Sequence, residues 1–310
     1  MKESLISIAL CTYNGETHIK EQLESILKQS YTNLEIIVVD DCSGDNTFSI
    51  LQQIAETDTR IKIYQNDKNL GFNKNFEKAI SLTSGDLIAI SDQDDIWLPS
   101  KIQDLNNCIG NKWLVFSNSA FLTPAGITQG KLVENIIPNT LTYTALLLNN
   151  VVTGHTILFK REFLPYVLPI PHLGYYDWYM GFIAAYHNQI DFCNKVLTRY
   201  RIHPGSVIQK RHSKILSENV KGEENFRLVY AQLNAFLSYK GLKPEDKLFI
   251  ETLKDSYLKK TRGFSVNLFR IIMSRYDELF LNKKRKGLSL LNFALKFSRK
   301  ISIKAFENRN

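Results

Sequence analysis

Three carboxylates fall within four residues in the first third of the chain. Asp92, Asp94 and Asp95 follow an apolar run and precede Ile96-Trp97-Leu98-Pro99. Ionised carboxylates at this spacing repel one another, so the cluster is costly unless a cation shares it. Asp92 and Asp94 point the same way on extended backbone and can therefore ligate one ion. Oxygen ligands of this kind suit Mg²⁺ or Mn²⁺, completed by substrate phosphates and water.

A divalent ion at this place would hold a diphosphate and neutralise it as a leaving group. The alternative is a solvated acidic turn, which is what most isolated Asp-x-Asp triplets form. We favour the metal interpretation because the triplet ends an apolar run and precedes an apolar segment that would pack it in place.

Polar residues also follow two earlier apolar runs. Thr12-Tyr13-Asn14 offers small polar and aromatic groups that could contact a nucleotide base and ribose. Asp40-Asp41 offers a carboxylate that could accept hydrogen bonds from a ribose or a base. Turn and helix-capping chemistry, which suits Ser43 and Asp45, explains the second stretch equally well, and both interpretations stay open.

These stretches lie at the ends of strands in an alternation of apolar runs and helix-spaced residues. The pattern predicts strands over 5–11, 34–39, 61–64 and 87–90, and helices around 19–27, 48–54 and 76–80. Such an alternation indicates βαβ units, an α/β fold class and a mostly parallel sheet. Ligands of such sheets bind beyond the carboxyl ends of the strands, where the polar stretches fall.

Composition narrows the class of protein. The 310 residues are 44% hydrophobic and 23% charged, which excludes wholesale disorder. The four cysteines are far apart, which excludes a cysteine zinc knuckle and argues against a disulfide-stapled secreted domain. The start of the chain carries no secretory pattern, and no apolar stretch approaches the ~18 residues of a spanning helix. We expect a soluble protein of a reducing compartment.

The net charge of +8 is unevenly distributed. Residues 211–310 hold 22 Lys and Arg against 10 Asp and Glu, whereas residues 1–210 have a balance of −4. We therefore divide the chain into an α/β domain, 1–210, and a basic helical region, 211–310. Apolar residues recur at helical spacing from Leu268 to Leu279, with Arg275 on the same face, and again from Leu291 to Ile301.

The basic region has three interpretations. Its helices pack as a subdomain against the first domain or a second subunit, which we favour for 268–281. Alternatively they dock on an anionic membrane surface, which we favour for 283–304 with its Lys283-Lys284-Arg285-Lys286 run. Nucleic-acid binding ranks last because no nucleic-acid module accompanies the charge, and we expect no nucleic-acid partner.

The polar stretches, taken together, resemble the motifs of family 2 glycosyltransferases, which have the GT-A nucleotide-diphospho-sugar fold. The matching segments stand in family order, and the most similar members are bacterial rhamnosyltransferase-like enzymes of surface polysaccharide synthesis. The segments are 7–14, 35–43, 69–75, the acidic cluster, 153–155, 176–179 and 200–203. The resemblance covers about residues 4–210.

The resemblance implies roles for individual residues. The donor nucleotide pocket would be lined by Thr12, Tyr13, Asn14, Asp41, Asn69, Gly71 and Asp92. Asp92 would also contact the metal, and Asp94 would be the direct metal ligand. Asp40 is expected to have a structural role instead. For Asn69 and Gly71 the alternative is an N-x-G turn, which is a common structural device.

Asp177 is the expected catalytic base. Inversion at the anomeric carbon needs a carboxylate opposite the departing diphosphate, to take the proton of the attacking hydroxyl. Many family members carry Glu-Asp here, whereas this chain has Tyr176-Asp177. The alternative is a helix N-cap before 178–185.

Four residues are assigned to the diphosphate or acceptor side: His155, Trp178, Arg201 and His203. Three of them have a structural alternative: a tight packing turn for His155, core packing for Trp178 and a structural histidine for His203.

The implied activity is inverting, metal-dependent transfer of one hexose, with rhamnose as the first guess, from a UDP- or dTDP-linked donor to a glycan or lipid-linked acceptor. The Q-x-x-R-W motif of processive synthases is absent, which indicates single-sugar transfer. The expected location is the cytoplasm, at the inner face of the plasma membrane. The alternatives are a sugar nucleotidyltransferase, although 11–16 lacks a Gly-rich triphosphate loop, and a catalytically silent sugar- or lipid-binding scaffold. A homo-oligomer is left open.

Overall fold

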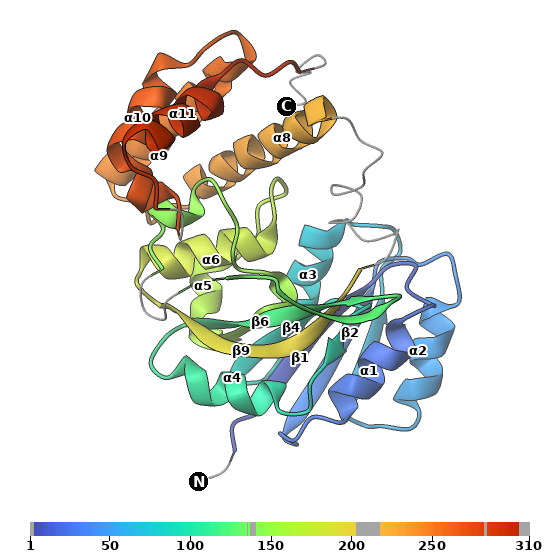
Figure 1. The fold of residues 1–310 in the computed structure, drawn as a ribbon. Helices are drawn as coiled ribbons and strands as arrows, with labels where there is room; N and C mark the ends of the chain where they lie inside the picture. Colours follow the sequence, from blue (N-terminus) through green and yellow to red (C-terminus); the bar gives the residue numbers. More distant parts are fainter. Residues whose placement is uncertain (1–2, 135, 137–140, 203–217, 282–283, 304–310) are drawn as a thin grey trace. The chain divides into compact units, whose positions relative to one another are not determined.

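The computed structural model describes residues 3–134, 136, 141–202, 218–281 and 284–303 (Figure 1). The chain forms two compact units: unit 1 comprises 1–141 and 151–202, and unit 2 comprises 142–150 and 203–310. The segment 142–150 belongs to unit 2 because its 3₁₀ turn Thr144–Leu146 packs on helix α10 (Val266–Leu279). In addition, the Tyr143 hydroxyl donates to Asp246 at 2.5 Å.

Unit 1 contains a nine-stranded sheet whose first half is parallel. The strands of that half are β1 (Ile6–Thr12), β2 (Leu34–Asp40), β3 (Ile61–Gln65) and β4 (Leu87–Ser91), in the order β3-β2-β1-β4. The connecting helices are α1 (Ile19–Leu27), α2 (Thr47–Ala55) and α3 (Phe72–Ser81). The structure therefore confirms the seven elements that the pattern of buried runs and helical spacing predicted, with boundaries shifted by a few residues.

The second half of the sheet is mixed. Its strands are β5 (Ile96–Trp97), β6 (Leu114–Thr123), β7 (Gly126–Lys131), β8 (Ile157–Lys160) and β9 (Ile190–Arg201). Strand β8 lies antiparallel between β4 and β6, and β9 runs parallel to β6. The short β5 follows the acidic cluster directly and pairs with β9, which brings the end of β9 to that cluster.

The first strands are buried on both faces. All residues of β1 and β2 are buried. Ile8 and Leu10 of β1 join one apolar cluster with Leu23 of α1 and Leu105 of α4 (Lys101–Ile109), so α1, α2 and α4 cover one face (Figure 1). Helix α3 contacts β1 and β2 as well. Burial of each such side chain contributes about 1.5–3 kcal/mol, which fixes the ends of these strands in space.

Unit 2 is helical in its described part. Besides α10 it contains α8 (Glu218–Leu237), α9 (Pro244–Leu258) and α11 (Gly287–Ser298). The sequence placed Arg275 on the inward face of α10, but the backbone there is non-helical and Arg275 is exposed. Tyr276, four residues after the buried Ile272, lies on the buried face instead and is 3% exposed. Ile301, expected on the second face, lies beyond the end of α11.

None of the described helices is both long and apolar enough to cross a lipid bilayer.

Candidate active site

The polar stretches meet at one edge of the sheet because their strands are parallel and in register. Thr12 pairs with Asp40, and Leu10 pairs with Ser91, the last residue of β4. The acidic cluster follows Ser91 directly. The edge predicted from the strand ends is thus the edge that the fold builds.

The loop after β1 is held by side chains from two other strand ends. The Thr12 hydroxyl donates to Asp40 at 2.8 Å, and Asn14, at φ 49°, accepts from the Gly44 amide at 2.8 Å. Tyr13 leaves its ring 49% exposed at this edge, where a base could stack.

Gln93 fixes the same loop and was not singled out from the sequence. Its side chain accepts from the Tyr13 amide at 2.8 Å and donates to the Tyr13 carbonyl at 3.1 Å. A methyl group on Gly15 would meet the Gln93 amide at 2.3 Å, so the close approach requires glycine. The sequence signal for Gln93 was its place between Asp92 and Asp94. On extended backbone its side chain points to the side opposite theirs.

Asp41 organises the loop that begins α3. Its two oxygens accept from Asn66 Nδ2 at 2.7 Å, from the Leu70 amide at 2.8 Å and from the Gly71 amide at 2.9 Å. Asn69 donates to the Asp41 carbonyl at 3.3 Å, and Gly71 adopts φ 79°, which favours glycine. Asp41, Asn69 and Gly71 therefore do lie together, with Asp41 only 3% exposed.

The acidic cluster faces a buried imidazole. His155 lies in the 3₁₀ turn Gly154–Thr156, and its Nδ1 is 3.7 Å from Asp92 Oδ2 and 3.6 Å from Asp95 Oδ2. Asp95 and His155 are fully buried, whereas the Asp92 side chain is 36% exposed. Burial and the charges of Asp94 and Asp92 raise the pKa of Asp95, and His155 opposes that shift. Burial opposes protonation of His155, but Asp95 and Asp92 outweigh it and raise its pKa.

Lys101 is a fully buried ammonium group next to this turn. Its Nζ donates to the His155 carbonyl at 2.6 Å and to Thr198 Oγ1 at 2.8 Å, and lies 3.7 Å from the centre of the Trp97 ring. Burial lowers the pKa of Lys101 well below its usual value, although Asp95 and Asp92 act against that shift. The burial of Lys101 was not predicted from the sequence, because a lysine at the start of a helix usually points to solvent.

Asp177 lies in the first turn of α6 (Tyr176–Tyr186). The helix begins at Tyr176 with Tyr175 as its N-cap, so the capping alternative for Asp177 is wrong. Its carboxyl accepts from the Gly154 amide at 3.0 Å and from the Trp178 amide at 2.6 Å. Burial and, to a smaller extent, the charge of Asp92 raise the pKa of Asp177 to about 7 against these two donors.

The acidic cluster and Asp177 share one electrostatic environment. Burial raises the pKa of the Tyr200 hydroxyl, and Asp92, Asp95, Asp94 and Asp177 all add to that shift. The Tyr200 ring also stacks on His155, with 4.8 Å between the ring centroids.

The turn that presents His155 is tied to α6 by close packing. A methyl group on Gly154 would lie 2.1 Å from the Tyr176 hydroxyl oxygen, so only glycine allows the Gly154 amide to reach Asp177. Asn73 of α3 then fixes the loop before α6. Its amide donates to the carbonyls of Pro171, His172 and Gly174, and its oxygen accepts from the Tyr176 amide at 3.1 Å.

Three residues predicted for the diphosphate or acceptor side remain: Arg201, Trp178 and His203. Arg201 donates from Nε to the Asp94 carbonyl at 2.8 Å and pairs with Glu21 at 2.5 Å, while its amide donates to Asp95 at 3.2 Å. Trp178 is 2% exposed, which favours the core-packing alternative over stacking on a sugar. His203 lies outside the described residues.

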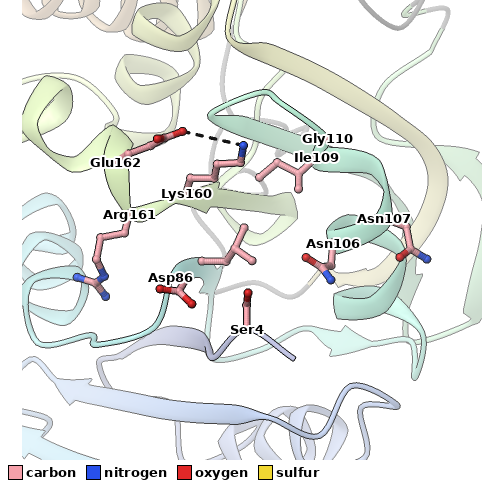
Figure 2. Close-up of a pocket in the computed structure, with 10 residues that line it drawn as sticks. Ser4, Asp86, Asn106, Asn107, Ile109, Gly110, Lys160, Arg161 and Glu162 are labelled. Carbon is pink, nitrogen blue, oxygen red and sulfur yellow. Dashed lines mark ion pairs between the residues drawn. The ribbon is translucent and has the colours of Figure 1, made fainter. Parts of the chain in front are cut away.

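A cavity of about 480 Å³ lies at the opposite ends of the strands (Figure 2). Ser4 and Asp86, which precede β1 and β4, line it together with Asn106 and the Lys160–Glu162 ion pair at 4.0 Å. The residues of the carboxyl-end site do not line it, so we do not assign it to the chemistry.

The carboxyl-end site has a donor set that fits a divalent cation. Ligand atoms of Asp92, Asp95 and His155 all lie within 4.8 Å of one another. Oxygen atoms with one imidazole nitrogen form a set that Mn²⁺ accepts.

Comparisons with known proteins agree with this geometry. Residues 7–164 match the family model Glycosyl transferase family 2. The chain is 30% identical over 228 residues to UDP-Glc:alpha-D-GlcNAc-diphosphoundecaprenol beta-1,3-glucosyltransferase WfgD of Escherichia coli, covering 69% of this chain and 84% of the relative. It is 39% identical over 115 residues to dTDP-rhamnosyl transferase RfbG of Shigella flexneri, covering 36% of this chain and 38% of the relative.

A solved structure shares the fold. Mannosyltransferase PcManGT from Pyrobaculum calidifontis, in complex with GDP-Man and Mn²⁺, superposes with a TM-score of 0.61 at 16% identity, covering 96% of this chain and 86% of that chain. The chain therefore has the GT-A fold and belongs to glycosyltransferase family 2.

Proposed function

We propose that this family 2 glycosyltransferase inverts the anomeric centre while it moves one hexose from a nucleoside diphosphate donor to a glycan or lipid-linked acceptor, with Asp177 as the base. The observation that carries the proposal is the pairing of two carboxylate sets. The 154–156 turn joins them: the Gly154 amide donates to Asp177 at 3.0 Å, and Nδ1 of the next residue, His155, lies 3.7 Å from Asp92 Oδ2. One set suits the diphosphate with its cation, and the other suits the attacking hydroxyl.

In the proposed reaction the acceptor hydroxyl attacks the anomeric carbon from the face opposite the diphosphate. Asp177 takes the hydroxyl proton as the new C–O bond forms and the bond to the diphosphate breaks. The transition state resembles an oxocarbenium ion, as in glycoside hydrolysis. The Gly154 and Trp178 amides hold the carboxylate in one orientation, which supports its use as a positioned base.

A divalent cation, Mn²⁺ or Mg²⁺, would be held by Asp92 and Asp94 and would neutralise the leaving diphosphate. The Gln93 side chain supports this arrangement because it ties the cluster to the loop that carries Tyr13 and Asn14. We assign Thr12, Tyr13, Asn14, Asp41, Asn69 and Gly71 to the nucleotide side of the same edge.

The relatives support a UDP- or dTDP-linked hexose as donor and a lipid-linked acceptor. The name of the Escherichia coli relative specifies a UDP-glucose donor and a diphosphoundecaprenol acceptor, and that of the Shigella relative a dTDP-rhamnosyl donor. We extend both classes to this chain and place the reaction at the cytoplasmic membrane surface. The basic residues 211–310 would attract the chain to anionic lipid there.

The experiment is a donor screen with the purified full chain. UDP- and dTDP-linked hexoses are incubated with Mn²⁺ or Mg²⁺ and a lipid-diphosphate-linked N-acetylhexosamine, and nucleoside diphosphate release is measured. We expect acceptor-dependent release with one donor, loss of release with EDTA, and an inverted anomeric configuration in the product by NMR. Release that persists in EDTA, or a product with retained configuration, would overturn the proposal.

A further inference from the structure

Two buried polar atoms face each other next to the acidic cluster without a hydrogen-bond partner. They are Asp95 Oδ2 and His155 Nδ1, they lie 3.6 Å apart, and both side chains are 0% exposed. At that distance they do not form a hydrogen bond with each other. A buried polar atom left unpaired costs about 1–3 kcal/mol, so two of them side by side indicate that something else binds between them.

The orientation of the imidazole shows what that group offers. His155 Nε2 lies 2.8 Å from Ser119 Oγ, and the ring stacks on Tyr200 at an interplanar angle of 2°. When Nε2 carries the proton and donates to Ser119, the lone pair of Nδ1 points at Asp92 and Asp95. An imidazole nitrogen that faces two carboxylates in this way needs a positive charge at that place, either a proton on Nδ1 or a cation between the three groups.

The arrangement resembles how proteins prepare a histidine to ligate a metal. The nitrogen away from the metal donates to a fixed oxygen, which sets the tautomer and the ring orientation. Asp92 completes the set, with its Oδ2 3.7 Å from the same Nδ1. Its side chain is 36% exposed, so a cation held here remains open to a diphosphate arriving from solvent.

We propose that His155 Nδ1 and Asp95 join Asp92 and Asp94 as ligands of the divalent cation, and that the nitrogen ligand makes the site select Mn²⁺ over Mg²⁺. The inference rests on the proposed metal-dependent transfer and adds a ligand set to it. Mg²⁺ favours all-oxygen ligands, whereas imidazole suits the transition metals. His155 was assigned to the acceptor side from the sequence, so the inference moves it to the cation.

The test is pulsed electron paramagnetic resonance of the full chain loaded with Mn²⁺ alone, without donor or acceptor. We expect ¹⁴N modulation from a directly bound imidazole in the unaltered protein. We also expect the Kd for Mn²⁺, from titration of the free-ion signal, to be at least roughly tenfold lower than the Kd for Mg²⁺. The absence of ¹⁴N modulation in the unaltered protein would overturn the inference without the need for any variant.

Two variants identify the histidine. His155→Gln should abolish the modulation, whereas His187→Gln, the control at the C-terminal end of α6, should retain it. Modulation that survives in His155→Gln overturns the inference. If His155→Gln fails to fold by circular dichroism, Ser119→Ala serves instead: it keeps the ligand but frees its orientation, and it should raise the Kd for Mn²⁺ severalfold.

The outcome is separable from that of the proposed function. Sugar transfer without ¹⁴N coupling leaves the proposed function intact and removes His155 from the metal. Coupling lost in His155→Gln but no transfer with any donor keeps the ligand assignment and contradicts the activity.

Discussion

Asp177 illustrates how one side chain is prepared for chemistry by its neighbours. Two backbone amides hold its oxygens, while burial and the charge of Asp92 raise its pKa to about 7. A base is most effective when its pKa lies near the working pH, because it is then both ionised and able to accept a proton. The environment of Asp177 satisfies that condition.

The first prediction is the pH profile of turnover. Only the ionised carboxylate accepts a proton, so protonation of Asp177 below its pKa removes the active form. We expect kcat at saturating donor and Mn²⁺ to fall about tenfold per pH unit below pH 7 and to level off above it. Stopped assays from pH 5.5 to 8.5 measure this, and a flat profile across that range would contradict the assignment.

The sequence predicted the type and place of most candidate site residues but not their partners. Asp92 and Asp94 were predicted because they stand between an apolar run and an apolar segment, and Asp177 because of the family resemblance. The partnership of His155 with Asp95 was invisible, since the two lie 60 positions apart and meet only through the antiparallel β8. Lys101 and Gln93 were missed for the same reason: their contacts depend on side-chain direction in three dimensions.

At the scale of elements, the site depends on how α3, the 154–156 turn and α6 fit together. Asn73 makes four hydrogen bonds to the loop before α6 and to its first residue. Gly154 lets the turn approach Tyr176 closely enough to hold Asp177. The start of α6 is therefore fixed from both sides.

The second prediction concerns Asn73→Ala. The change leaves several carbonyl groups without their donor, so we expect a loss of about 1–3 kcal/mol in the free energy of unfolding. Turnover should fall about tenfold while donor affinity stays close to that of the unaltered chain, because α6 carries the proposed base and not the proposed nucleotide pocket. Urea unfolding and separate kcat and Kd measurements test this.

The matched control is Asn107→Ala on the exposed face of α4, whose side chain accepts only from Gln103 at 3.2 Å among the bonds described. It should change the unfolding free energy by less than about 0.5 kcal/mol. Equal stability and turnover in the two variants would show that Asn73 does not position α6.

The order of elements was more predictable than their pairing. Alternating buried runs and helices specify βαβ units, and β1 to β4 with their helices follow from them. The mixed half of the sheet could not be predicted in this way. Strand β8 is only four residues long and β5 only two, and neither has a hydrophobic pattern of its own. The kink at Arg275 likewise has no signal in the hydrophobic periodicity of the sequence.

At the scale of the whole molecule, the two units differ in charge. The acidic balance lies in residues 1–210, which carry the site, and the basic balance in residues 211–310. Unit 2 also exposes Phe264 by 45% and Val266 by 51%, next to Arg262 at the start of α10. Aromatic and basic side chains together are typical of surfaces that enter the lipid headgroup layer.

The third prediction is salt-sensitive binding to anionic vesicles. The full chain should sediment with vesicles containing an anionic lipid and not with neutral ones, and binding should weaken as salt rises. Phe264→Asp should reduce the binding roughly tenfold, the equivalent of losing one buried apolar side chain. Ile127→Asp in unit 1, which is similarly exposed at 51%, is the control and should bind as the unaltered chain does. Equal binding to neutral and anionic vesicles would refute membrane docking through this surface.

The most direct measurement is donor binding and sugar transfer by Asp177→Asn. Asparagine keeps one oxygen as an acceptor for the backbone amides of Gly154 and Trp178, gives up the other, and cannot take a proton. The account predicts a Kd for the donor within about twofold of the unaltered chain and a loss of about 10²–10⁴-fold in kcat. Transfer by Asp177→Asn at a rate within a few fold of the unaltered enzyme would contradict it.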